Sequence, residues 1–156
     1  MAQKILVAFD DSENALRAVN YVAKSFRPDN SVTLFSVLQD TATLCEMNSP
    51  ELTPYFKSQQ QAFCTLEEKK KDLVQTALIK AKDLLLEAGF KPDSIVMKAE
   101  GKKKGVARDI VDEAGLGYDL IVIGRRGTTG LKDYFMGTIS QKVLHLAQES
   151  SVLIVN

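Results

Sequence analysis

Short apolar runs alternate with amphipathic segments along the whole of this 156-residue chain. Almost continuously apolar runs predict strands at residues 4–9, 31–37, 94–99, 119–123 and 152–155. Such runs are typical of parallel strands covered on both faces, and strands that alternate with helices join through right-handed crossovers. We therefore expect a single doubly wound α/β domain over residues 1–156. Its five-stranded parallel sheet has the order 3-2-1-4-5, with helices on both faces.

Four segments between the strands have apolar residues at helical spacing and predict helices. These helices are expected to begin at Ser12, at about Thr65, near Gly105 and at Thr138. The second helix is the longest and ends at Gly89. The stripe that it is expected to bury comprises Leu66, Val74, Ala77, Ala81, Leu84 and Ala88. Residues 39–62 are less regular, because Pro50 and Pro54 oppose one continuous helix.

Charge and cysteine content limit the partners and the compartment. Twenty Lys and Arg residues balance twenty Asp and Glu residues, so we expect neither nucleic acid nor an anionic membrane as a partner. The N-terminal stretch lacks a signal-peptide core, and no apolar run approaches the roughly 18–20 residues that span a bilayer. Cys45 and Cys64 belong to no Cys-x-x-Cys pair and are expected to be free thiols. These features favour a cytoplasmic protein.

A glycine-rich stretch follows the fourth predicted strand and ends where the last helix begins. Gly124, Gly127 and Gly137 precede Thr138 in this stretch. Ligands of doubly wound sheets bind beyond the carboxyl ends of the strands, and the first turn of a helix offers N–H groups to an anion. The stretch therefore either holds a phosphate against bare backbone or forms a turn in which Thr138 is only the helix N-cap. The sequence has neither the P-loop pattern nor Gly-x-Gly-x-x-Gly after the first strand.

The spacing Gly124-x2-Gly127-x9-Gly137-Thr138 resembles the nucleotide-binding signature of the universal stress protein family, in its ATP-binding subgroup. The likeness covers the whole chain, from the first two strands to the last helix and the closing strand. The resemblance implies a site for ATP, or for AMP or ADP, together with Mg2+. It also implies a homodimer through residues 151–156 and a regulatory role in the stress response, with at most slow nucleotide hydrolysis.

Carried over position by position, the resemblance implies which residues contact the nucleotide. The phosphate and ribose contacts fall on Gly124, Gly127, Gly137, Thr138 and Ile139. Asp10 lies beside the nucleotide, the backbone of Val37 meets adenine, and Ala8 and Ile123 flank it. The chain departs from the family at Ala8, where Pro is frequent, and at Phe9, where smaller residues are common.

Other readings of the sequence find less support. Asp10 and Asp11 resemble the acidic pair of a receiver domain, but the third and fifth strands lack the Asp and Lys that such a domain requires. His145, the only histidine, falls on the outward side of the last helix, so we expect no metal cluster and no nucleophile–base pair. Two alternative functions stay open. One is a dimeric member that binds no nucleotide and acts by docking a partner, and the other is an enzyme of the nucleotide α-hydrolase type.

Three charged stretches are interpreted as solvated charge. They are residues 67–72 on the long helix, residues 102–104 after the third strand and residues 125–126 after the fourth. For the second and third stretches, contact with an anion is the alternative.

Overall fold

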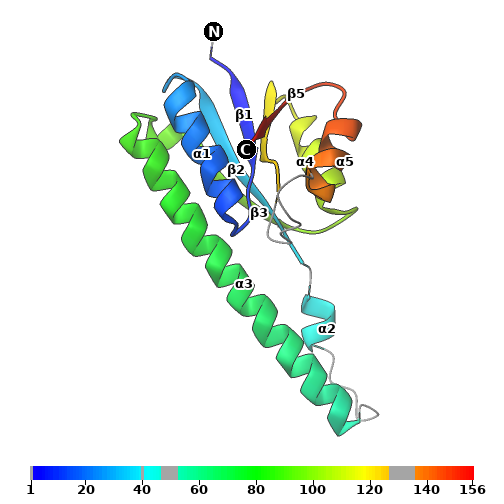
Figure 1. The fold of residues 1–156 in the computed structure, drawn as a ribbon. Helices are drawn as coiled ribbons and strands as arrows, with labels where there is room; N and C mark the ends of the chain where they lie inside the picture. Colours follow the sequence, from blue (N-terminus) through cyan, green and yellow to red (C-terminus); the bar gives the residue numbers. More distant parts are fainter. Residues whose placement is uncertain (1, 40, 47–52, 127–135) are drawn as a thin grey trace.

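The structure, a computed structural model, describes residues 2–39, 41–46, 53–126 and 136–156. Its strands form one parallel sheet in the order β3-β2-β1-β4-β5 (Figure 1). The strands are β1 (Lys4–Ala8), β2 (Ser31–Leu38), β3 (Ile95–Gly101), β4 (Leu120–Gly124) and β5 (Ser151–Val155). The predicted fold class and strand order are confirmed.

Helices cover both faces of the sheet, as predicted. They are α1 (Glu13–Ser25), α2 (Ala42–Glu46), α3 (Pro54–Glu87), α4 (Val106–Ala114) and α5 (Thr138–Leu146), with a short 3-10 helix at Pro92–Ser94. Successive side chains of a strand point to opposite faces, so the side chains of β1 contribute to two hydrophobic cores, one on each face of the sheet. Ile5 and Val7 belong to the core under α1 and α3, whereas Leu6 belongs to the core under α4 and α5. Figure 1 shows these helix pairs on opposite sides of the sheet.

Helix α1 begins at the predicted place. Ser12 is its N-cap, and the Ser12 hydroxyl accepts a hydrogen bond from the N–H of Ala15 at 3.2 Å. This cap satisfies one of the first-turn donors and turns the chain from β1 into α1. Phe9, Asp10 and Asp11 therefore lie in the short connection at the carboxyl end of the sheet.

Helix α3 begins at Pro54, so the prediction of a helix from about Thr65 was wrong. Proline is well suited to the first turn of a helix, and the Thr53 hydroxyl caps this one by accepting from the N–H of Phe56 at 3.2 Å. The buried residues of α3 are Val74, Leu78, Ala81 and Leu85. Leu66 was predicted to be buried but is 65% exposed, because residues 54–73 extend beyond the sheet (Figure 1).

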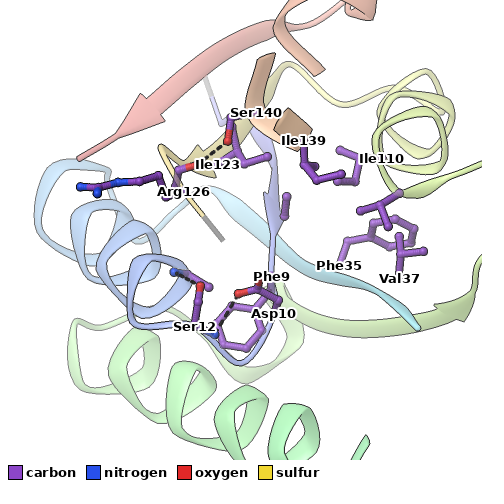
Figure 2. Close-up of a pocket in the computed structure, with 14 residues that line it drawn as sticks. Phe9, Asp10, Ser12, Phe35, Val37, Ile110, Ile123, Arg126, Ile139 and Ser140 are labelled. Carbon is purple, nitrogen blue, oxygen red and sulfur yellow. Dashed lines mark hydrogen bonds between the residues drawn. The ribbon is translucent and has the colours of Figure 1, made fainter. Parts of the chain in front are cut away.

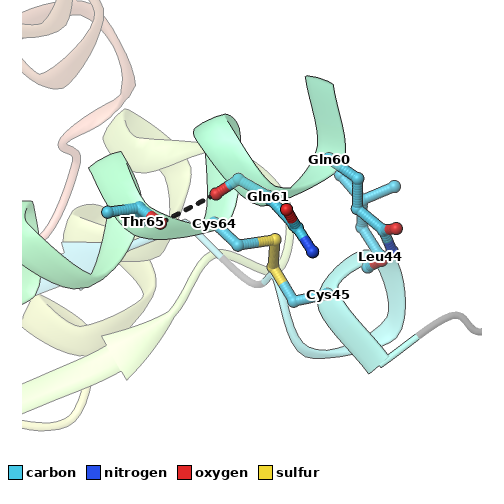
Figure 3. Close-up of a disulfide and its surroundings, with 6 residues drawn as sticks. All are labelled: Leu44, Cys45, Gln60, Gln61, Cys64 and Thr65. Carbon is cyan, nitrogen blue, oxygen red and sulfur yellow. Dashed lines mark hydrogen bonds between the residues drawn. A yellow bond between two sulfur atoms is a disulfide. The ribbon is translucent and has the colours of Figure 1, made fainter. Parts of the chain in front are cut away.

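Cys45 and Cys64 form a disulfide, so the prediction of free thiols was wrong. The chain doubles back between α2 and α3 and brings the two Cα atoms to 5.9 Å across 19 residues of sequence (Figure 3). The side-chain amide of Gln60 also donates to the carbonyl of Leu44. Short helix α2 is therefore fastened to the outer part of α3. The spacing of two isolated cysteines does not reveal such a return of the chain.

None of the helices in the described ranges combines the length and the apolar character that a bilayer-spanning helix needs.

Candidate functional site

The carboxyl ends of β2, β1 and β4 are neighbours in the sheet, and β1 lies between the other two. The helices after β1 and β4 lie on opposite faces, α1 on one and α5 on the other (Figure 1). Doubly wound sheets bind their ligands in the crevice that this divergence creates. Two adjoining cavities occupy this place in the structure.

The first cavity, which we call the apolar chamber, has a volume of about 100 Å3. Strand ends and helices α1, α4 and α5 supply its apolar lining, much of which Figure 2 shows. These lining residues are Ala8, Phe9, Ala15, Phe35, Val37, Val106, Ile110, Ile123 and Ile139. Such a lining suits a flat group with apolar faces.

The second cavity, which we call the polar chamber, has a volume of about 290 Å3. It shares Phe9, Asp10 and Val37 with the apolar chamber, so the two are contiguous. Gly137 and Thr138 line it where α5 begins. Its other polar and charged lining residues are Asp11, Ser36, Gln39, Glu67, Lys70, Lys71, Lys102 and Ser140.

Gly137 is the N-cap of α5, and Thr138 is the first residue of the helix. The alternative in which Thr138 is the N-cap was therefore wrong. Among the described residues, no side chain caps this helix by a hydrogen bond. The N–H groups of Thr138 and Ile139 lie in the first turn, where a helix supplies no acceptor of its own. These donors and the positive end of the helix dipole face the end of the sheet at which the chambers lie, and they suit an anion.

Hydrogen bonds hold the start of α5 against the end of β4. The Ser140 hydroxyl donates to the carbonyl of Gly124 at 2.7 Å, and the N–H of Gly137 donates to the carbonyl of Arg125 at 2.7 Å. The N–H of Arg125 in turn donates to the carbonyl of Val155 at 2.8 Å. The position of the first turn of α5 is therefore fixed by the sheet.

Gly124 has a packing role that the sequence does not reveal. A Cβ placed on Gly124 would lie 3.0 Å from both the Cβ and the carbonyl oxygen of Asn14 in α1. Such a contact is tighter than nine in ten real Cβ contacts, so the neighbouring backbone would have to move by a few tenths of an ångström. The absence of a side chain at Gly124 therefore allows α1 to pack against the end of β4.

Polar groups from the ends of β1 and β2 face the site. One carboxylate oxygen of Asp10 accepts the N–H of Ser12 at 2.9 Å, which orients the Asp10 side chain (Figure 2). Oδ1 of Asp11 and Oγ of Ser36 are buried without a hydrogen-bond partner among the described residues. Unpartnered buried polar atoms are uncommon and call for a ligand or an ordered water.

Phe9 does not obstruct the chambers. Its ring is 5% exposed and belongs to the core under α1 and α3, so it forms a wall of both cavities. The core therefore accommodates the large side chain of Phe9, at a position where the family commonly has a smaller residue.

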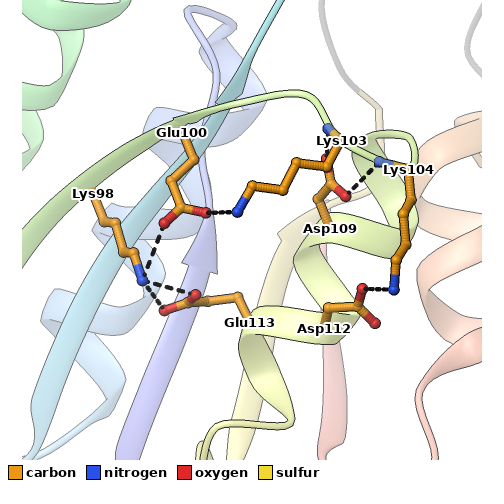
Figure 4. A network of polar contacts seen from close by, with 7 residues as sticks. All are labelled: Lys98, Glu100, Lys103, Lys104, Asp109, Asp112 and Glu113. Atoms are coloured by element: carbon orange, nitrogen blue, oxygen red, sulfur yellow. Dashed lines mark hydrogen bonds and ion pairs between the residues drawn. The ribbon is translucent and has the colours of Figure 1, made fainter.

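The loop after β3 brings Lys102 to the polar chamber. The carboxylate of Asp109 accepts the N–H groups of Lys103 at 2.8 Å and Lys104 at 3.0 Å (Figure 4). Burial raises the pKa of the Asp109 carboxyl, but hydrogen bonds from these amides outweigh burial, so its pKa lies below the ordinary value. The loop is thus anchored to α4 by a carboxylate that stays charged.

A model of the universal stress protein family matches residues 1–156. The chain belongs to the universal stress protein family. A comparison with curated proteins gave no match.

Solved structures resemble this universal stress protein over nearly its whole length. Hypothetical protein MJ0577 is 25% identical, with a TM-score of 0.68 over 99% of this chain and 96% of that one. The universal stress protein UspA from Lactobacillus plantarum is 19% identical, with a TM-score of 0.70 over 99% and 97%. A universal stress protein solved in complex with cAMP is 18% identical, with a TM-score of 0.63 over 99% and 97%. The two less similar structures support the fold alone.

The structure gathers the predicted site residues that it describes. Those that line the apolar chamber are Ala8, Asp10, Val37, Ile123, Gly124 and Ile139. Gly137 and Thr138 line the polar chamber. Gly127 lies outside the described residues. His145 is exposed on α5, as the sequence predicts.

The sequence analysis missed the residues that α3 contributes to the site, and it missed Ser36 of β2. Lys70 and Lys71 were read as solvated charge, because their distance along the chain from the glycines gives no sign that α3 passes over the site. Ser36 precedes Val37 at the end of β2, so its place in the strand was the one signal that could have indicated it.

Proposed function

We propose that this universal stress protein binds an adenine nucleotide across the two chambers, with ATP as the principal ligand and ADP or AMP as related ones. One observation carries the proposal: the apolar chamber and the polar chamber adjoin each other beside the first turn of α5. The complex of another universal stress protein with cAMP supports an adenine nucleotide as the ligand.

In the proposed arrangement, the base occupies the apolar chamber and the phosphates occupy the polar chamber. The base packs against Val37 and Ile110, and the carboxylate of Asp10 accepts a hydrogen bond from a ribose hydroxyl. The phosphates accept from the amides of Thr138 and Ile139. Hydrogen bonds to charged groups contribute about 1.5–3 kcal/mol each, so a few of them are enough for micromolar affinity.

We propose that Mg2+ arrives with the phosphates. Within the described residues, no group of three or more His, Cys, Asp or Glu side chains is placed to hold a metal ion alone. Asp11 offers one unpartnered carboxylate oxygen at the polar chamber, and Mg2+ favours a few protein oxygens combined with phosphate oxygens.

The proposed role is regulatory, with nucleotide turnover that is slow at most. Fast hydrolysis needs a positioned base, and two of the three carboxylates that line the polar chamber, Asp10 and Asp11, are proposed to serve ribose and Mg2+. In such a role, the fraction of the protein that holds a nucleotide would follow the concentration of that nucleotide in the cell.

Isothermal titration calorimetry tests the proposal. ATP, AMP and cAMP are titrated in the presence of Mg2+, with ribose 5-phosphate as the control that lacks a base. We expect saturable binding of the adenine nucleotides and weak or no binding of the control. A flat ATP titration would refute nucleotide binding.

We also propose a homodimer through residues 151–156. Within the described sheet, β5 pairs only with β4 and leaves its other edge open, and an open apolar edge favours pairing with another strand. Light scattering at micromolar concentration tests this proposal, and a monomer would contradict it. A dimer combined with a flat ATP titration would favour the second candidate function, a stress protein that acts by docking a partner.

A further inference from the structure

Three lysines from two separate elements line the polar chamber. Lys70 and Lys71 come from α3, and Lys102 comes from the loop after β3. The α3 lysines are set in place by Val74, one turn further along the helix and buried against the sheet. The N–H of Lys102 donates to the carbonyl of Leu38 at 2.7 Å, which fixes its backbone at the end of β2. All three side chains therefore start from backbone that the core holds.

These lysines differ from their neighbours in the loop, whose charges are already paired. Lys103 lies 3.8 Å from Glu100, and Lys104 lies 3.0 Å from Asp112 (Figure 4). Among the residues that the structure describes, Lys70, Lys71 and Lys102 form no ion pair within 4.0 Å. Their ammonium groups remain available to an anion in the chamber.

The polar chamber also contains groups that call for a ligand. The side chain of Ser36 is only 1% exposed, lines the chamber and has no hydrogen-bond partner within the described part of the chain. A hydroxyl that is buried without a partner loses the free energy of its hydration, about 1–3 kcal/mol. The Ser36 hydroxyl could donate a hydrogen bond to a phosphate oxygen in the chamber.

The chamber carries both signs of charge. Asp10, Asp11 and Glu67 line it together with the three lysines. Asp10 and Asp11 follow β1, whereas among the chamber-lining residues of α3 the two lysines outnumber the single acid, Glu67. A ligand with a neutral part and an anionic part therefore has a preferred orientation. The anionic end lies toward α3 and the start of α5.

We infer that Lys70, Lys71 and Lys102 hold the terminal phosphates of a nucleoside di- or triphosphate and thereby set the preference of the site for phosphate number. The inference rests on the proposed nucleotide binding and adds to it a preference for the number of phosphates. The lysines line the polar chamber in addition to Gly137 and Thr138, so each added phosphate can gain contacts that a monophosphate lacks. Binding should therefore strengthen from AMP to ADP to ATP.

The experiment compares AMP, ADP and ATP titrations at one fixed salt concentration, because salt screens such contacts. The test protein is the double variant Lys70→Gln/Lys71→Gln, and the matched control is Lys69→Gln. Lys69, Lys70 and Lys71 are all exposed on α3, but Lys69 does not line the polar chamber. Circular dichroism confirms that each variant is folded.

We expect the ratio of ATP to AMP affinity to fall about tenfold in the double variant, with AMP affinity unchanged. The control should keep the ratio of the parent protein. If the double variant keeps the ratio, or if Lys69→Gln lowers it equally, the assignment of these lysines is overturned while nucleotide binding stands. If the parent protein binds none of the three nucleotides, the proposed function itself has failed.

Discussion

The ammonium group of Lys98 lies 2.9 Å from one carboxylate oxygen of Glu113 and 3.0 Å from the other (Figure 4). The Tyr118 hydroxyl donates to the same carboxylate at 3.2 Å. Glu113 is buried, so its charge depends on these partners. The cluster joins β3 to α4 below the end of the sheet at which the chambers lie.

This cluster predicts a loss of stability at alkaline pH. The hydrogen bond to Glu113 raises the pKa of Lys98 above 10.5, although burial opposes it, and burial raises the pKa of Tyr118 above 10.0. Groups whose pKa is raised by folding stabilise fully below their unfolded pKa and lose this contribution as the pH rises through the folded pKa. The free energy of unfolding should therefore fall above about pH 10.

Urea unfolding at several values between pH 7 and pH 11 checks this expectation, with Glu113→Gln as the comparison. The variant should lose about 1–2 kcal/mol at pH 7, since Lys98 is partly exposed to solvent. It should also show a smaller alkaline decline. An equal decline in both proteins would show that the cluster does not cause it.

Gly124→Ala should destabilise the fold. The new Cβ would meet Asn14 at 3.0 Å, so α1 or the end of β4 has to shift. Overpacking of this kind costs about 1–3 kcal/mol, which thermal or chemical unfolding measures. An unchanged free energy of unfolding would show that the contact relaxes without cost.

Gly137→Val should weaken ATP binding and leave the fold intact. The backbone angles of Gly137 are φ −60° and ψ 152°, which a valine adopts, but the new side chain would stand at the polar chamber. Calorimetry should show at least about tenfold weaker ATP binding, with a free energy of unfolding close to that of the parent protein. If this variant binds ATP as tightly as the parent protein does, the proposed place of the phosphates beside Gly137 is wrong.

Reduction of the disulfide should loosen the outer part of α3 and spare the core. The bond closes a loop of 19 residues, for which chain entropy predicts roughly 3 kcal/mol, but only α2 and the outer part of α3 are joined. Hydrogen exchange should therefore accelerate in residues 42–66 after treatment with a reductant, with slow exchange retained in β1. Cys45→Ser provides the same comparison without a reductant, and unchanged exchange at residues 42–66 in that variant would contradict the prediction.

The fold could be predicted because the same local pattern, a short apolar run followed by an amphipathic segment, recurs along the sequence. The central strands β1, β2 and β4 are buried on both faces and therefore show short apolar runs, as at Ile5, Leu6 and Val7. The start of α3 was not predictable in the same way. Pro54 was read as a helix breaker, whereas the Thr53 cap makes it the first residue of the helix.

The site was predictable where it follows the strand ends and the glycine spacing. Asp10 and Val37 follow or close their strands, and Gly137 and Thr138 mark the start of a helix. Lys70 and Lys71 could not be assigned, because the direction in which a long helix crosses a sheet is decided by packing far from those residues. The disulfide was missed for a similar reason, since only the return of the chain brings Cys45 to Cys64.

The first thirteen residues of α3, from Pro54 to Leu66, contain no buried side chain and line neither chamber. This projection therefore takes no part in holding the sheet together, and its surface is free to diverge in evolution at little thermodynamic cost. Its length and chemistry can be matched to whatever the molecule encounters in the cell, while the domain behind it stays the same.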